Sequence, residues 1–315
     1  MGAAEDSGAQ DPGGEVYRDT EQTWTTPVVV SVQSRVAMGH VGNSAAVFPL
    51  QLAGLAVVDV PTALLSNHPF YPGHRGRLLG ADLVGDLLLG IAERGVGRVA
   101  SAVVSGFLGT APVAPVVAAF VRSARDTNPS LRYVCDPVLG DVGPGLYVDP
   151  GLVAHYRREL VPLADVVTPN VFELELLTAP GVADVADLEQ RAGELLGART
   201  AAVVVTGAVL TDTPEGCLDT VVVTSADGRR GTWRIRGRRR DRHFDGTGDL
   251  FTALFTTAWL RPGGATGVVQ AAAAAVGGTG AVVDRTVADG TKELQVVAVG
   301  SGLFDAAPGS VERLH

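Results

Sequence analysis

Short apolar runs rich in valine alternate with amphipathic stretches along most of the chain. Such runs predict β-strands near residues 27–32, 56–60, 100–105, 131–135, 165–168 and 201–205, with helices between most of them. Strands that alternate with helices form a parallel sheet covered on both faces. The pattern therefore predicts an α/β domain with a mostly parallel central sheet.

The alternation changes near residue 217. Two strand-like runs, Leu218–Thr224 and Gly231–Ile235, flank the turn-forming residues 225–228 and predict a β-hairpin. Two helices are expected after it, at 247–260 and about 265–284, and a last strand near Glu293–Val299.

One folded domain is expected over residues 27–305. Residues 1–26 carry Gly, Asp, Glu and Gln without a periodic apolar pattern, which predicts a disordered N-terminal tail. Residues 306–315 are expected to form a short C-terminal tail. No internal repeat and no linker divides the domain.

Composition narrows the class of partner. A formal net charge of -9 argues against nucleic acid, because phosphate binding needs a basic face. No apolar run reaches the ~18 residues of a spanning helix, and the acidic start does not resemble a signal peptide. Cys135 and Cys217 fit neither a disulfide framework nor paired zinc ligands. A cytoplasmic protein without a membrane partner is predicted.

Lys292 is the only lysine, and arginine supplies the rest of the 25 basic residues. A Walker-type ATP site needs a glycine loop ending in Lys-Ser or Lys-Thr, whereas Lys292 is followed by Glu293. P-loop kinases are therefore excluded. A Schiff-base mechanism is disfavoured as well, unless Lys292 serves it.

The most informative segment is Gly246-Thr247-Gly248-Asp249, a glycine loop that runs into the amphipathic helix expected at 247–260. Glycines let backbone N–H groups converge, and a helix N-terminus favours negative charge, so the loop suits a phosphoryl group. Asp249 would lie beside that anion hole as a general base. The alternative is an aspartate that only stabilises the helix N-terminus.

Two further segments place polar residues at predicted strand ends. Asp136 and Asp141 follow the strand at 131–135, where carboxylates at the carboxyl edge of a parallel sheet can hold hydrated Mg²⁺. Each aspartate could instead belong to a turn. Asn170 and Glu173 follow the strand at 165–168 and could face nucleotide phosphates, or could form a capping box alone.

Polar residues also follow the first two strands, in the stretches Ser31–Ala45 and Ser66-Asn67-His68-Pro69. They could grip a small polar ring or simply form loops and caps. Arginines cluster at 229–242, where a solvated hairpin face is the favoured interpretation and attraction of nucleotide phosphates the alternative.

Taken together, these segments resemble the pyridoxal kinase family of ribokinase-like fold across roughly residues 27–300. The Gly-Thr-Gly-Asp loop alone marks only the wider superfamily of sugar, nucleoside and vitamin kinases. Its combination with the other stretches points to pyridoxal. The stretches that carry the resemblance are Ser31-Val32-Gln33-Ser34, Ser66-Asn67-His68, Cys135–Asp141, Thr168–Glu173, Gly246–Asp249 and Glu293–Val297, the last similar to the family's closing strand.

The resemblance implies a three-layer α-β-α sandwich, a homodimer, and ATP and pyridoxal as substrates with Mg²⁺ and, in some members, K⁺ or Na⁺. It implies Asp249 as the base, with Gly246, Thr247 and Gly248 as the anion hole. The implied vitamer-binding residues are Ser34, Val41, His68, Pro69 and Phe107, together with Asp249. The implied ATP-binding residues are Asp136, Asn170, Glu173, Thr206, Gly207 and Thr247. The implied metal-binding residues are Asp136, Asp141, Thr168 and Glu173, with Thr206 among the positions that help to hold a monovalent cation in some members.

Three departures from the family pattern concern the vitamer. Pro69 stands where many relatives have a threonine, Phe107 where a tyrosine is frequent, and Arg35 where a histidine is frequent. Because proline lacks both the hydroxyl and a backbone donor, the preferred vitamer stays open. The alternatives are a hydroxymethylpyrimidine kinase of the same fold and a non-catalytic sensor of pyridoxal phosphate.

Overall fold

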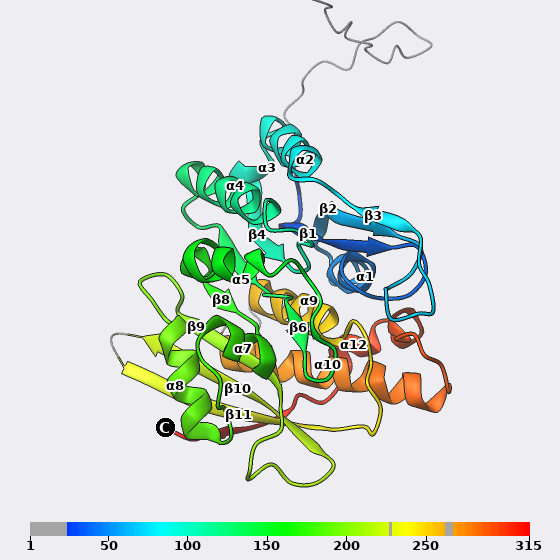
Figure 1. Ribbon diagram of the computed structural model, residues 1–315, viewed down its shortest axis with the longest axis vertical. Helices are drawn as coiled ribbons and strands as arrows, with labels where there is room; N and C mark the ends of the chain where they lie inside the picture. Colours follow the sequence, from blue (N-terminus) through cyan, green and yellow to red (C-terminus); the bar gives the residue numbers. More distant parts are fainter. Residues whose placement is uncertain (1–23, 227–228, 262–266) are drawn as a thin grey trace, which may run out of the picture.

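The computed structural model describes residues 24–226, 229–261 and 267–315. Its centre is a ten-stranded sheet in the order β12-β11-β10-β9-β8-β5-β4-β1-β2-β3 (Figure 1). The six predicted strands are present as the parallel part of this sheet. They are β1 (Val28–Val36), β2 (Ala56–Leu65), β4 (Ala100–Ser105), β5 (Arg132–Cys135), β8 (Val166–Val167) and β9 (Ala202–Ala208).

Antiparallel strands close both edges of the sheet. β3 (Gly76–Leu78) pairs with β2, and the predicted hairpin is present as β10 (Cys217–Ala226) and β11 (Arg229–Arg238). The two turn residues 227–228 lie outside the described residues. A small separate ribbon joins β6 (Gly140–Asp141) to β7 (Gly145–Leu146).

Helices cover both faces of the sheet, which confirms the three-layer prediction (Figure 1). One layer contains α2 (Ala81–Glu93), α3 (Val96–Val99), α4 (Val113–Thr127), α5 (Gly151–His155), the π-helical turn η1 (Tyr156–Leu160), α6 (Val161–Leu163), α7 (Val171–Leu177) and α8 (Val185–Leu195). The other contains α1 (Asn43–Leu52), α9 (Thr247–Leu260), α10 (Val268–Ala288), α11 (Val296–Val299) and α12 (Gly302–Asp305).

Strand β1 shows why two cores form. Val28, Val30 and Val32 belong to the core beneath α2 and α4, whereas Val29 belongs to the core beneath α1 and α9. Successive strand side chains point to opposite faces, so a run of valines serves both layers. None of the helices in the described ranges is long and apolar enough to cross a membrane.

Two predictions about the C-terminal region are wrong. Residues 296–299 form the short helix α11 rather than a closing strand, and the expected tail at 306–315 contains β12 (Ser310–Arg313). Strand β12 pairs with β11 from Trp233↔Arg313 to Arg236↔Ser310, so it occupies the sheet edge. All four residues of β12 are exposed, and the strand therefore lacks the apolar alternation that would have predicted it.

The arginine cluster is only partly a solvated face. Arg234 is buried and lies between Asp212, whose Oδ2 accepts a 2.7 Å hydrogen bond from Nη2, and the fully buried Asp219. Arg236 also donates to Asp219. A buried carboxylate needs such partners, so these two arginines stabilise the hairpin. The predicted N-terminal tail falls almost entirely on residues 1–23, outside the described residues.

Candidate active site

The glycine loop at the start of α9 is fixed by close backbone packing. Gly246 has a φ of 84°, and a Cβ added there would collide with the carbonyl oxygen of His40. Only glycine satisfies both conditions. Behind the loop, Leu250, Phe251 and Phe255 are buried, which anchors the first turns of α9. The sequence thus holds the N-terminus of α9 against the loop that follows β1.

Asp249 lies in the first turn of α9 and is joined to that same loop. The backbone N–H of Gly42 donates a hydrogen bond to its carboxylate. Burial nevertheless raises the pKa of Asp249 to about 6. Gly42 lies in turn against Ser34, because a Cβ at Gly42 would collide with the Ser34 carbonyl and hydroxyl oxygens. The structure therefore brings the predicted base and the predicted ring contact Ser34 together.

A second carboxylate lies beside Asp249. Asp136 follows β5 and is buried, and the Thr252 hydroxyl donates a 3.0 Å hydrogen bond to its Oδ2. Thr168 completes this group, with its hydroxyl 3.2 Å from that of Thr252. Burial, and then the negative charge of Asp249, raise the pKa of Asp136 to about 8. Two neighbouring carboxylates that resist joint ionisation form an environment that favours a cation.

This donor set fits Mg²⁺ held mainly through water and phosphate. The described residues contain no group of three His, Cys, Asp or Glu side chains arranged to hold a metal ion. Mg²⁺ commonly keeps several waters and binds through one or two carboxylates plus substrate phosphates. Asp136 therefore fits the role of one such carboxylate, and the described residues do not form an all-protein Mg²⁺ site.

The predicted capping box at the start of α7 is present. Asn170 Oδ1 accepts from the Glu173 N–H at 2.8 Å, and Glu173 Oε2 accepts from the Asn170 N–H at 2.9 Å. Glu173 Oε1 also accepts from the N–H of Leu139 at 3.0 Å. Burial, and then the charge of Asp136, raise the pKa of Glu173. The cap thus places Glu173 beside Asp136, and Asp136, Asp249 and Glu173 are together called the acidic group below. Contact of Glu173 with metal or nucleotide stays a prediction.

The predicted nucleotide residues lie around Asn170. Its side-chain amide donates to the Gly140 carbonyl at 2.9 Å, and Asn170 forms a parallel bridge with Thr206. Gly207 follows with a φ of 65°.

Two further predicted residues lie at the glycine loop. Asp141 is half-buried, and its Oδ2 lies 4.0 Å from Nδ1 of His243, just before that loop. The hydroxyl of Thr247 already has a partner within the loop, because it donates a 3.2 Å hydrogen bond to the Phe244 carbonyl.

On the opposite side of Asp249, His68 is the best-formed candidate contact for the vitamer. His68 is 8% exposed, its ring packs 4.6 Å from that of Tyr71, and its Nε2 lies 3.6 Å from Asp245. Its Nδ1 is buried without a hydrogen-bond partner among the described residues. Buried polar atoms are nearly always satisfied, so the fold leaves the polar contacts of this ring incomplete.

The remaining vitamer predictions are less well supported. Val41 is half-buried in the loop that contacts Asp249, whereas Pro69 is exposed next to His68. The Phe107 ring lies against Gly109, and its carbonyl accepts a hydrogen bond from the Thr62 hydroxyl. Arg35 is exposed and forms an ion pair with Asp59. Contact of these four side chains with a vitamer stays a prediction.

Two residues near the site were missed by the sequence analysis. Tyr147 is 40% exposed, yet partial desolvation, followed by the charges of Glu173 and Asp249, raises the pKa of its hydroxyl, so it lies near those two carboxylates. Its ring meets that of Phe70 edge-on at 5.9 Å, which joins the loop after β7 to the loop after β2. No motif surrounds Tyr147 in its glycine-rich loop. The second, Glu293, lies in a stretch that suggested a strand.

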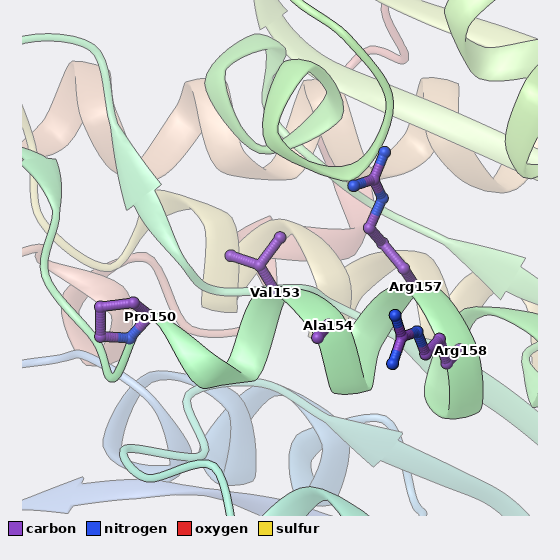
Figure 2. A pocket seen from close by; sticks show the side chains of 5 residues that line it. All are labelled: Pro150, Val153, Ala154, Arg157 and Arg158. Atoms are coloured by element: carbon purple, nitrogen blue, oxygen red, sulfur yellow. The ribbon is translucent and has the colours of Figure 1, made fainter.

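Two hollows on the surface lie away from the predicted site residues. One of about 420 Å³ is lined by residues of α5 and η1 and by Pro150, and none of its lining residues is a predicted site residue (Figure 2). The guanidinium of Arg157 at its edge already has partners, because it donates hydrogen bonds to the carbonyls of Leu177 and Thr178. We therefore place the candidate active site at Asp249.

Comparisons with known proteins show what this chain is similar to. Residues 98–286 match the family described as phosphomethylpyrimidine kinase. A pyridoxal kinase PdxY of Rubrobacter xylanophilus is 38% identical over 276 residues, which are 87% of this chain and 93% of that protein. A pyridoxine/pyridoxal/pyridoxamine kinase of Bordetella avium is 40% identical over 228 residues, 72% of this chain and 76% of that protein.

A solved structure is similar over the whole domain. The pyridoxal kinase of Leishmania donovani, in complex with ADP and pyridoxamine, superposes with a TM-score of 0.85 at 28% sequence identity. The superposition covers 91% of this chain and 99% of that one. The fold expectation drawn from the sequence is confirmed.

Proposed function

This chain belongs to the pyridoxal kinase family, and on that premise we propose that it transfers the γ-phosphoryl group of ATP to the 5′-hydroxymethyl oxygen of pyridoxal. One observation carries the proposal. Asp249 lies at the N-terminus of α9, is bonded to the Gly42 amide, and is joined through Gly42 to Ser34. A carboxylate in that position can accept the hydroxyl proton beside a ready anion hole.

Asp249 is suited to general-base chemistry near neutral pH. With a pKa of about 6, it is mostly ionised at pH 7 and still basic enough to take a proton as the hydroxyl attacks phosphorus. The N–H groups of residues 246–248 lie at the N-terminus of α9, where they and the helix dipole would stabilise negative charge on the transferring group. In-line transfer then depends mainly on positioning.

The acidic group would hold the nucleotide end. Asp136, and with it Asp141, Thr168 and Glu173, would bind Mg²⁺ directly or through water, while Asn170, Thr206 and Gly207 would line the path of the phosphates. Bound Mg²⁺ neutralises phosphate charge and orients the γ-phosphoryl group. Thr168 and Thr206, with Asp141, would take part in holding K⁺ or Na⁺.

The vitamer would lie between Ser34, Val41 and His68. The position of His68 supports this placement, because its ring lies 3.6 Å from Asp245, directly before the glycine loop. Pro69 and Phe107 would border the ring. We also infer that the protein acts in the cytoplasm and that it forms a homodimer. Light scattering on the purified protein tests the homodimer directly.

The proposal is tested by ATP consumption with Mg²⁺ and K⁺ present, offering pyridoxal, pyridoxine, pyridoxamine and hydroxymethylpyrimidine separately. Pyridoxal-dependent turnover with formation of pyridoxal 5′-phosphate is the expected result. Turnover with the pyrimidine alone would replace the proposal by the second candidate, which the description of the matching family favours. Tight vitamer binding without turnover would indicate a sensor instead.

A further inference from the structure

Glu293 has a role that the fold does not explain. It was expected to belong to a closing strand, yet it lies between α10 and α11, outside any strand. Strand β12 occupies the sheet edge in its place. The carboxylate of Glu293 instead reaches the two loops that follow β1 and β2.

Each carboxylate oxygen of Glu293 holds a different loop. Oε2 accepts a hydrogen bond from the backbone N–H of His40 at 3.2 Å, and Oε1 accepts one from the Tyr71 hydroxyl at 2.5 Å. Nε2 of His68 lies 3.5 Å from Oε1. Gly39, with a φ of 98°, allows this close approach, because a Cβ there would collide with Oε2. The carboxylate is thus wedged between loops whose sequences leave room for it.

The two loops carry the parts that must meet during the reaction. The first continues from His40 to Gly42, whose N–H bonds to Asp249, and the His40 carbonyl lies against Gly246. The second carries His68 with its unpartnered Nδ1. Hydrogen bonds to an ionised carboxylate are among the stronger ones in proteins. A single carboxylate therefore ties the candidate vitamer contact to the candidate base.

We propose that Glu293 is a positioning residue that holds the vitamer loop and the Asp249 loop in register for phosphoryl transfer. The inference rests on the proposed function. Glu293 acts through His40, His68 and Tyr71 and does not touch the reacting atoms. A nucleophile displaced by about 1 Å can lose as much as ~10²-fold in rate, so register between these loops matters for catalysis.

The test compares Glu293→Gln with Tyr71→Phe, with the double variant, and with Asp289→Asn as a matched control. Glutamine keeps the shape but turns one acceptor into a donor that faces the His40 N–H or the Tyr71 hydroxyl. Asp289 lies at the end of α10, where it pairs with Arg285, and its change removes a carboxylate of similar exposure away from the site.

We expect Glu293→Gln to lower kcat/KM for pyridoxal by about 10-fold or more, with the KM for ATP and the thermal midpoint close to wild type. Tyr71→Phe should lower kcat/KM for pyridoxal by a smaller factor. The double variant should lose less than the product of the two single losses, because both changes break the same hydrogen bond, the one from Tyr71 to Glu293. The control should match wild type. A KM for ATP raised as much as the KM for pyridoxal, or a loss that follows the folded fraction, would overturn the inference.

Equilibrium binding of pyridoxal without ATP separates this inference from the proposed function. If wild type binds pyridoxal but does not phosphorylate it, the proposed function fails. Weaker binding by Glu293→Gln would then still support the positioning role. Unchanged binding and unchanged kcat/KM in that variant would refute it, whatever the activity of wild type.

Discussion

At the scale of single residues, the site depends on how one carboxylate is held. Gly42 and Gly246 allow the loop after β1 to lie against the start of α9, and the Gly42 N–H then orients Asp249. A cap that served stability alone would have its carboxylate bonded to the N–H groups of its own first turn. The hydrogen bond from a distant loop favours the catalytic alternative for Asp249.

Replacing Asp249 by asparagine tests that alternative. The side chain keeps its shape but loses its basicity, so we expect turnover with pyridoxal to fall by at least ~10²-fold. The circular dichroism spectrum and ATP binding should stay close to wild type. Steady-state kinetics under saturating ATP measure the loss. Turnover within a few-fold of wild type would remove Asp249 from the role of base.

The pH dependence of activity follows from the raised pKa of Asp249. A base must be ionised, so kcat/KM for pyridoxal should rise as pH increases through about 6 and level off above it. An ordinary aspartate would place this limb near pH 4. Rates measured from pH 5 to 8 at fixed ionic strength decide between them. A rate that is already level at pH 5 would show that burial does not tune this group.

At the scale of elements, the capping box of α7 links stability to the site. Asn170 Oδ1 caps the helix, its amide holds the Gly140 carbonyl, and its N–H bonds to Glu173. Asn170→Ala should therefore destabilise the protein by about 1 kcal/mol and raise the KM for ATP more than that for pyridoxal. Denaturant unfolding and kinetics measure the two effects. Asp184→Ala in the exposed capping box of α8 is the matched control, with a stability loss only.

The elements that periodicity predicted well are those whose own residues decide their structure. Valine runs such as Val28–Val32 pack into both cores, and the helix from Thr247 to Leu260 begins and ends as its sequence indicates. Ser310–Arg313 becomes a strand by pairing with the edge that β11 offers, whereas Val296–Val299 forms a short helix outside the sheet. Such outcomes depend on partners that local sequence does not contain.

The site was predictable where residues share a motif. Asp249, Asn170 and Glu173 belong to recognisable patterns, and the structure places all three in or beside the acidic group. Tyr147 lies in an unpatterned loop and Glu293 in a stretch that predicted a strand. Their contacts join segments far apart in sequence, as the hydrogen bond from Tyr71 to Glu293 illustrates. Contacts of that range follow from the assembled fold and not from spacing.

At the scale of the whole molecule, the carboxylates proposed to serve activity lower the stability of the fold when they are ionised. Asp136 and Asp249 have pKa values of about 8 and about 6, above the ordinary 3.8 of an aspartate. Between pH 4 and 8 these two carboxyl groups therefore bind more protons in the folded protein than in the unfolded chain, and their contribution to stability should fall as pH rises through that range. Below about pH 4 both states are protonated and this loss of stability disappears.

The variant Asp249→Asn should for that reason be more stable than wild type while being far less active. An aspartate at a helix N-terminus usually stabilises by 0.3–1 kcal/mol, but a pKa still raised to about 6 means that the cost of burying the charge exceeds that gain. In EDTA, the free energy of unfolding should increase by about 1–3 kcal/mol at pH 8 and hardly change near pH 4. Denaturant unfolding at both pH values measures the difference. A variant less stable than wild type at pH 8 would show that the Gly42 amide and the helix N-terminus stabilise the charge fully, and that the site stores no such cost.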